Sequence, residues 1–393
     1  MLFLYEVFTA TLVVLLAAGI VEQRGHERNL RAIPTRVVVN GIRGKSSITR
    51  LCAGALRGGE LRVVAKTTGT AARFIHPDAD EEPVYRKFDI ANVVEQIGIV
   101  RRAAKLEPDV LVMECMAVMP ALQEINQSKL VQAGIVVISN VREDHLQEMG
   151  PTLPDVARSL SRSMPVGGIC VTAEQDLLPV LQEEADRRSC VLLSADPDSI
   201  TDEDMAGFTH HTFRENVAIA LTVAEHLAVP RELAIKGMWA APPDPGVLTV
   251  EPYQFGTKTL RVANVFAAND PRSTVMNVRE LLARGEIRPP VFALINCRPD
   301  RVERNGQMGE IVPELCSDKL FVIGHPARSA LAKVPADWPG EAHDLGGAGR
   351  RVEEIVQSIV DQVEDEACLI AIGNIHGQGE VLLEHLRRRG KPC

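Results

Sequence analysis

Residues 37–50, which read VVVNGIRGKSSITR, constrain the fold more than any other stretch of the chain. A run of β-branched apolar residues ends in a turn with two glycines, and a lysine and two serines then open a helical pattern over 46–58. A buried strand that leads through a glycine turn into a helix is typical of parallel-sheet α/β domains, where the helix N-terminus presents backbone N–H groups to an anion. We therefore expect an anion-binding turn at the edge of a parallel sheet.

The alternation of strand and helix patterns continues along the chain. Short apolar runs, each followed by polar or glycine residues, lie at 35–40, 61–67, 109–115, 133–140, 167–173 and 190–195. Apolar residues throughout a strand indicate burial on both faces, and hence a parallel sheet covered by helices. The pattern predicts a parallel-sheet α/β domain over 36–240.

A second domain follows a stretch rich in proline. The segment AAPPDPGVL at 240–248 interrupts both periodicities, so we place a linker at 241–258. Further strand patterns lie at 259–266, 290–296, 319–324 and 368–374. They predict a smaller, Rossmann-like α/β domain over 259–393.

The N-terminus differs from the rest of the chain. Residues 2–21 are apolar apart from Glu6 and two threonines, and their number is about that needed to cross a bilayer. The segment 23–35 is basic, and positive flanks stay in the cytoplasm. We expect residues 1–22 to form a membrane helix, with the remainder on the cytoplasmic face. A buried or interfacial helix is the alternative, whereas a signal peptide would need a positive start that is missing here.

Charge and cysteine content restrict the partners and the compartment. The formal net charge is −9, which argues against nucleic acid as the main partner because phosphate contacts need a basic face. The eight cysteines are scattered without a C-x-x-C pair. We expect reduced thiols in a cytosolic compartment and no zinc site.

The glycine turn has the spacing G-x-x-G-K-S. Lys45 is placed to reach the β and γ phosphates of ATP, and the Ser46 hydroxyl is placed to reach Mg²⁺. The alternative is a turn that only caps a helix, with Lys45 in solvent. The ATP-binding residues that we predict in this turn are Asn40, Gly41, Gly44, Lys45, Ser46 and Ser47.

Two later strand ends supply groups that suit a divalent metal ion. Glu114 follows the apolar run DVLVM, and Asp144 and His145 follow IVVISN. Because the carboxyl ends of parallel strands meet at one edge of a sheet, we expect both positions to lie near the glycine turn. We predict Lys45, Glu114 and His145 as catalytic residues. The predicted ligands of Mg²⁺, with Mn²⁺ as the alternative metal, are Ser46, Glu114 and His145.

These motifs resemble the Mur ligase superfamily, which includes the folylpolyglutamate synthases. Within it, the chain most resembles the ligase subunits of bacterial poly-γ-glutamate synthases. The segments that carry this resemblance are NGIRGKSS (40–47), KTTGTAARF (66–74), ECMAVMP (114–120), SNVREDHLQEMG (139–150) and FRENVAIAL (213–221). The apolar N-terminus also fits this branch.

The resemblance implies a P-loop ATPase domain like the central domain of Mur ligases, followed by the Rossmann-like domain. It implies that ATP phosphorylates the terminal carboxylate of a poly-γ-glutamate chain, and that the amino group of the next glutamate, L or D, attacks the acyl phosphate. It also implies small integral-membrane synthase or export subunits at the bacterial plasma membrane. A homo-oligomer is left open.

Further site residues come from the resemblance alone. It places the acceptor near Thr67, Thr68, Gly69, Thr70 and Arg73. It places the nucleotide near Asn216, Asn269, Asp270, Arg298, Asp300 and Arg301. Two departures from the family pattern are evident: residues 156–168 contain no lysine that could be carbamylated to bind a second metal ion, and Thr212 and Phe213 replace a usual His-Asn pair.

Three alternatives to a poly-γ-glutamate ligase remain open on the sequence. The first is another Mur or folylpolyglutamate-type ligase with a different acceptor, such as folate or a cell-wall peptide. The second is a P-loop kinase or ATPase, which would hydrolyse or transfer phosphate without any dependence on an amino acid. The third is a nucleotide-binding scaffold without turnover.

Overall fold

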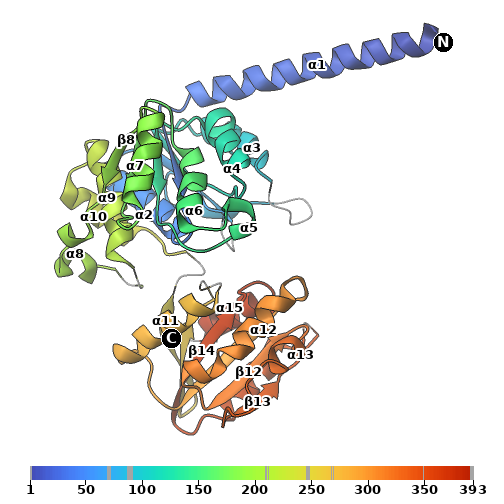
Figure 1. The fold of residues 1–393 in the computed structure, drawn as a ribbon. Helices are drawn as coiled ribbons and strands as arrows, with labels where there is room; N and C mark the ends of the chain where they lie inside the picture. The colour runs from blue at the N-terminus through green and yellow to red at the C-terminus, as the bar shows by residue number, and fades with distance from the viewer. Residues whose placement is uncertain are drawn as a thin grey trace. The chain divides into compact units, whose positions relative to one another are not determined.

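The structure, a computed structural model, describes residues 2–68, 72–85, 92–208, 210, 212–244, 248–266, 268, 270–347 and 349–389. The chain divides into two compact units, Met1–Asp244 and Pro245–Cys393. Both are α/β units built on a mainly parallel sheet, as the sequence predicts (Figure 1).

The sheet of the first unit has eight strands in the order β4-β3-β2-β5-β1-β6-β7-β8. These strands are β1 (Thr35–Asn40), β2 (Val63–Lys66), β3 (Arg73–Ile75), β4 (Glu81–Pro83), β5 (Val110–Glu114), β6 (Ile135–Ile138), β7 (Ile169–Thr172) and β8 (Val191–Ser194). All neighbours pair in parallel except β3 with β2 and β4 with β3. Strand β1 therefore lies between β5 and β6, and the ends of these three strands are adjacent.

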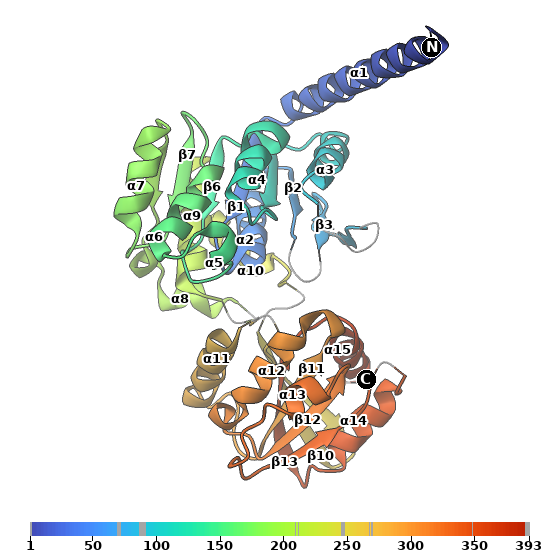
Figure 2. The same ribbon diagram turned by 45° about the vertical axis from the view of Figure 1, so that its right-hand side comes forward.

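Helices cover both faces of this sheet (Figure 2). The helices of the first unit are α1 (Leu2–Arg31), α2 (Lys45–Gly58), α3 (Glu95–Ala104), α4 (Pro120–Ile125), α5 (Leu146–Met149), α6 (Leu153–Leu160), α7 (Leu178–Arg187), α8 (Asp202–Ala206), α9 (Arg214–His226) and α10 (Arg231–Ala240), with a π-helical segment η2 (Asn126–Val131) after α4 and 3₁₀ turns η3 (Ser161–Ser163) and η4 (Pro197–Ser199). Helices α2, α9 and α10 pack on the face that includes Val37 and Val39. Helices α3, α6 and α7 pack on the face that includes Val38. Apolar residues on both faces of β1 thus account for its continuous apolar run.

Helix α1 is a single helix of 30 residues that runs through the predicted membrane segment and most of the predicted basic segment 23–35. Among the described residues, one helix is long and apolar enough to cross a membrane, namely Tyr5–Arg31, and none of its most apolar 18-residue window is buried. The C-terminal end of α1 packs on the rest of the first unit. His26 and Leu30 are buried there, and a ring nitrogen of His26 lies 3.0 Å from the Leu130 carbonyl oxygen.

Arg36, the second residue of β1, joins the end of α1 to the sheet. Its guanidinium donates to the carbonyl oxygens of Leu30 and Ile33 at 2.8 and 2.5 Å. It also donates to those of Val131 and Gln132 at 2.9 to 3.1 Å. Carbonyl groups at helix ends lack partners within the helix, and one arginine fork satisfies several of them here.

We expect Arg36→Ala to destabilise the first unit by about 2–3 kcal/mol, because it removes charge-assisted hydrogen bonds and leaves carbonyl groups unpaired. Thermal unfolding in detergent measures this loss. Arg31→Ala is the matched control, because the Arg31 side chain is 82% exposed and lies 3.6 Å from the Glu27 carboxylate on the same helix. Equal stability of the two variants would contradict the prediction.

The sheet of the second unit has six strands in the order β13-β12-β11-β14-β10-β9, with only β9 antiparallel to its neighbour. The strands are β9 (Thr249–Phe255), β10 (Lys258–Asn264), β11 (Val291–Cys297), β12 (Lys319–Gly324), β13 (Glu341–Asp344) and β14 (Glu366–Gly373). The helices are α11 (Pro271–Ala283), α12 (Val302–Glu310), α13 (Arg328–Leu331), α14 (Val352–Val360) and α15 (Gln378–Arg389), with 3₁₀ turns η5 (Pro299–Arg301) and η6 (Val312–Leu315). Strand β9 belongs to this sheet, although the sequence places residues 249–255 within a linker.

Candidate active site

The glycine turn lies at the carboxyl end of β1 and leads directly into α2. Gly44 has a φ of 77° and, as a glycine, provides no side-chain cap for the first N–H groups of α2. Gly41 has a φ of 124°, and a Cβ there would lie 2.0 Å from Ser139 Oγ. Both glycines are therefore required by the backbone path, which brings the turn against the end of β6.

We expect Gly41→Ala to weaken ATP binding about ten- to a hundredfold, because a positive φ and a clash with Ser139 each cost about 1–3 kcal/mol. Titration with a fluorescent ATP analogue measures the change. Gly98→Ala is the control, because a Cβ at Gly98 meets nothing within 4 Å. Unchanged affinity of a folded Gly41→Ala protein would show that the turn does not hold the nucleotide.

Lys45 folds back over the turn. Its Nζ donates to the carbonyl oxygens of Gly41 and Ile42 at 2.8 and 3.1 Å. Burial lowers the pKa of Lys45 below its usual value, and the Glu114 carboxylate opposes that shift. A cation at this position can neutralise a phosphate that settles on the start of α2.

Glu114, the last residue of β5, lies beside the first turn of α2. Its Oε2 accepts hydrogen bonds from Ser46 Oγ at 2.7 Å and from the Thr68 backbone N–H at 2.6 Å. The Glu114 side chain is buried. The neighbouring thiol of Cys115 is buried as well, which raises its pKa to about 11 and keeps it protonated. A hydroxyl and a carboxylate oxygen in contact suit Mg²⁺ or Mn²⁺, which bind few protein oxygens and complete their shell with phosphate and water.

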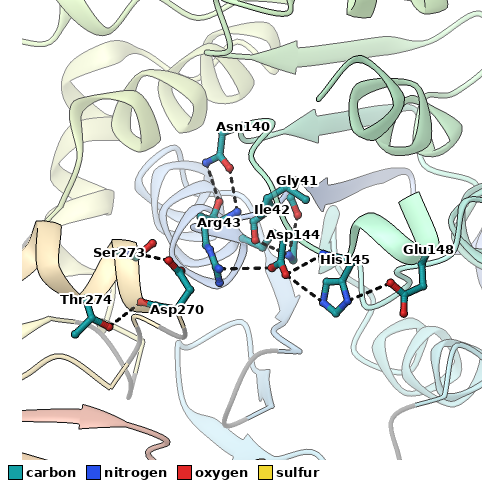
Figure 3. A network of polar contacts seen from close by, with 11 residues as sticks. Gly41, Ile42, Arg43, Asn140, Asp144, His145, Glu148, Asp270, Ser273 and Thr274 are labelled. Atoms are coloured by element: carbon teal, nitrogen blue, oxygen red, sulfur yellow. Dashed lines mark hydrogen bonds and ion pairs between the residues drawn. The ribbon is translucent and has the colours of Figure 1, made fainter. Parts of the chain in front are cut away.

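The loop after β6 grips the glycine turn from its other side (Figure 3). The Asn140 side chain accepts from the Arg43 N–H at 3.0 Å and donates to the Arg43 carbonyl oxygen at 3.1 Å. Ser139 Oγ donates to the same carbonyl oxygen at 2.7 Å, and the Asp144 carboxylate lies 3.5 Å from the Arg43 guanidinium. The predicted set contains neither Arg43 nor Asn140. Ser139 and Asn140 are the two polar residues that directly follow β6, but they hold Arg43 through its backbone atoms, so no sequence signal singles out this contact.

His145 lies on this loop but outside the Ser46–Glu114 pair. Its ring nitrogens are 3.8 Å from carboxylate oxygens of Asp144 and Glu148, and its side chain is about half exposed. Within the described part of the chain, no three His, Cys, Asp or Glu side chains gather where they could hold a metal ion. The structure thus brings Ser46 and Glu114 together and leaves His145 on the adjacent loop.

Asn216, on the first turn of α9, lies against the turn as well. A Cβ at Gly44 would meet its amide oxygen and nitrogen at 3.3 and 3.4 Å. Ser47 lies on the first turn of α2. Asn40 points elsewhere: its buried amide donates to Gln123 and Ser163 at 2.8 and 3.1 Å, so its side chain braces the helices on one face of the sheet.

The predicted acceptor segment is described in part. Thr68 holds Glu114 through its backbone, and Thr67 Oγ1 accepts from the Arg73 N–H at 3.1 Å. Arg73 begins β3, and its buried Nε has no hydrogen-bond partner among the described residues. Gly69 and Thr70 lie outside the described residues.

The predicted residues of the second unit lie near the carboxyl ends of β10 and β11. Asp270 caps α11 by accepting from the Ser273 N–H at 2.8 Å (Figure 3). Arg298 donates to both carboxylate oxygens of Asp300 at 2.8 and 3.0 Å, and Arg301 lies 3.8 Å from the same carboxylate. Asn269 lies outside the described residues.

Comparison with known proteins identifies the family. A family model described as the poly-gamma-glutamate synthase CapB C-terminal domain matches residues 250–389. The capsule biosynthesis protein CapB of Bacillus anthracis is 37% identical over 389 residues, which cover 98% of this chain and 82% of that protein. The chain belongs to the CapB family. The PGA synthase CapB of Bacillus subtilis (strain 168) is also 37% identical, over 95% of both chains.

Solved structures show the same fold at low sequence identity. The bifunctional folylpolyglutamate synthase/dihydrofolate synthase from Yersinia pestis CO92 has a TM-score of 0.67 and 16% identity, over 93% of this chain and 92% of that chain. A structure of such a bifunctional enzyme with Mn, AMPPNP and L-glutamate bound has a TM-score of 0.66. The predicted resemblance to the poly-γ-glutamate synthase branch is confirmed, and the predicted resemblance to the folylpolyglutamate synthases is confirmed as a shared fold.

Proposed function

We propose that this CapB-family chain is an ATP-dependent amide ligase that extends poly-γ-glutamate. The observation that carries the proposal is the contact of Ser46 with Glu114, at 2.7 Å, beside a G-x-x-G-K-S turn that opens a helix. This arrangement offers a triphosphate three features at once: a helix N-terminus, a lysine, and a pair of oxygens that can hold a divalent metal ion.

The chemistry explains why these groups are needed. The terminal carboxylate of the chain has to approach the γ-phosphate, and both carry negative charge. Lys45 and the N–H groups of α2 offset this repulsion and hold the phosphates in line for attack. The carboxylate oxygen then bonds to phosphorus while ADP leaves. The amine of the next glutamate attacks the resulting acyl phosphate, loses a proton and expels inorganic phosphate.

Ser46 and Glu114 are the residues that we propose to hold Mg²⁺, with Mn²⁺ as an alternative. When bound, such an ion neutralises charge on the β and γ phosphates during transfer. The oxygen-only pair is consistent with a hard cation. His145 stands beside Asp144 and Glu148 on the adjacent loop, so we propose it as a residue that meets the substrate side of the site rather than as a partner of Glu114.

The substrate assignments rest on placement within each unit. We propose that Thr67, Thr68 and Arg73 face the acceptor carboxylate, with Gly69 and Thr70 in the same segment, because the Thr68 N–H binds Glu114. Asn216, against Gly44, is proposed for the nucleotide side. Asn269, Asp270, Arg298, Asp300 and Arg301 are proposed as contributions of the second unit to nucleotide binding.

We also propose that α1 anchors the chain at the cytoplasmic face of a bacterial plasma membrane. The large apolar side chains that the structure describes between Phe3 and Val21 are exposed, which in water would be costly. A single helix cannot form an export path for a polyanion, so small integral-membrane subunits are the expected partners, and a homo-oligomer is the alternative assembly. Membrane flotation of the full chain, compared with a variant that lacks residues 2–21, tests the anchor.

Glutamate dependence of ADP release tests the ligase reaction. The full-length protein in detergent or membranes, with ATP, Mg²⁺ and a short poly-γ-glutamate acceptor, is expected to sustain steady-state ADP release only when glutamate is added. ADP release at the same rate without glutamate would indicate a P-loop ATPase or kinase. Release that depends on a folate or a cell-wall peptide would indicate another superfamily ligase.

A further inference from the structure

Glu174 is a buried carboxylate at the end of β7, one strand beyond the loop that holds the glycine turn. Its side chain is only 3% exposed. Its backbone N–H donates to Thr172 Oγ1 at 3.1 Å, which fixes the chain as it leaves the strand. Carboxylates are rarely buried unless several hydrogen-bond donors face them, so the donors that face Glu174 indicate its structural role.

Those partners belong to two different loops. Glu174 Oε2 accepts from the Val141 N–H at 2.9 Å and from Arg142 Nη1 at 3.1 Å. Glu174 Oε1 accepts from the Asp176 N–H at 3.1 Å. Arg142 Nη1 also donates to the Val141 carbonyl oxygen at 2.8 Å. The carboxylate therefore ties the loop after β7 to the loop after β6.

The loop after β6 is the one that grips the glycine turn. Val141 directly follows Asn140, whose side chain holds both the N–H and the carbonyl oxygen of Arg43. A continuous chain of contacts thus runs from Glu174 through Val141 and Asn140 to the phosphate-binding turn. Residues that contact the ligand-binding residues, but not the ligand itself, often control the geometry of a site as strictly as the ligand-binding residues do.

We propose that Glu174 is a positioning residue for nucleotide binding: it fixes the loop after β6 so that Asn140 holds the glycine turn in the form that accepts ATP. This inference rests on the proposed function only as far as the turn binds ATP, and it does not depend on what is ligated. The hydrogen bonds of Glu174 within the described part of the chain reach Val141, Arg142, Thr172 and Asp176 and not the turn, so its effect passes through Asn140.

The test is the dissociation constant of a fluorescent ATP analogue with Mg²⁺, measured on the full-length protein in detergent. Glu174→Gln keeps the size of the side chain but replaces one acceptor oxygen with an amide that opposes a backbone N–H. We expect the dissociation constant to rise about ten- to a hundredfold. Glu184→Gln is the matched control, because Glu184 is also mostly buried and bonded to one arginine, at 2.7 Å, away from the loop; it should bind as the wild type does.

A double-mutant cycle separates positioning from simple stability. If Glu174 acts through Asn140, Glu174→Gln should have little further effect on binding in an Asn140→Ala background. Additive effects, or a lower melting temperature with unchanged affinity, would overturn the proposal.

Should Glu174→Gln fail to fold, Arg142→Ala serves instead: Arg142 is 61% exposed, and its loss should weaken binding about threefold without unfolding the protein. Unchanged affinity of that variant would overturn the proposal too. Because binding is measured without glutamate, a failed ligase assay would leave this result unaffected.

Discussion

Lys45→Ala is expected to lower glutamate-dependent ADP release by about 10³-fold while the protein stays folded. Lys45 supplies the only lysine ammonium of the G-x-x-G-K-S turn, where its Nζ contacts the carbonyl oxygens of Gly41 and Ile42. Without this ammonium group, the negative charge of the γ-phosphate repels the attacking carboxylate. A factor of 10³ corresponds to about 4 kcal/mol of transition-state stabilisation.

Steady-state assays of the full-length protein, with its melting temperature measured in parallel, check this expectation. Lys129→Ala is the control, because Lys129 is an exposed lysine of the same unit. It should leave both the rate and the stability unchanged. A Lys45→Ala protein that retains more than a tenth of the activity would remove the phosphate-binding role of the turn.

Glu114→Gln is expected to reduce kcat/KM for ATP by about 10²-fold and to raise the Mg²⁺ concentration needed for half-maximal activity. The amide can still accept the hydrogen bonds from Ser46 Oγ and the Thr68 N–H, so the local structure should survive. What the variant loses is the negative charge that holds a divalent cation beside the phosphates.

Measuring the rate of Glu114→Gln as a function of Mg²⁺ concentration distinguishes a role of Glu114 in metal binding from a role in substrate binding. Glu183→Gln is the control, because Glu183 is an exposed glutamate that contacts Arg187 on the surface of α7. If Glu114→Gln lowered the rate but kept the wild-type Mg²⁺ requirement, Glu114 would act on the substrate rather than on the metal ion.

The sequence predicts the strands that are apolar on both faces and misses those that are not. Strands β1, β2 and β5 to β7 lie where their apolar runs predict them, because burial on both faces leaves a continuous signal. Strand β8 also lies at its predicted position, although its residues are partly exposed. Strand β4 reads Glu-Glu-Pro and β13 reads Glu-Ala-His-Asp, and such edge strands carry no pattern that separates them from loops. Strand β9 contains Pro252 and follows a proline-rich stretch, which hides it.

The sequence predicts a site residue where a charged or polar side chain ends an apolar run. It does not predict contacts in which a side chain binds backbone atoms. Glu114 is visible because a carboxylate ends an apolar run. The grip of Asn140 on Arg43 uses the backbone of Arg43, so nothing in the sequence announces it. Asn40 also ends an apolar run, yet strand alternation turns its side chain to the same face as Val38, away from the turn. Polar residues at strand ends are thus candidate site residues, but only the structure shows whether their side chains point toward the site.

Isotope transfer from carboxylate to phosphate tests the proposed reaction most directly. A short poly-γ-glutamate acceptor with ¹⁸O in its terminal carboxylate is incubated with the full-length protein, ATP, Mg²⁺ and glutamate, and the inorganic phosphate is analysed by mass spectrometry. Attack of that carboxylate on the γ-phosphate predicts one ¹⁸O atom in the phosphate released with each amide bond. Unlabelled phosphate, formed while glutamate is still being added to the chain, would contradict an acyl-phosphate ligase.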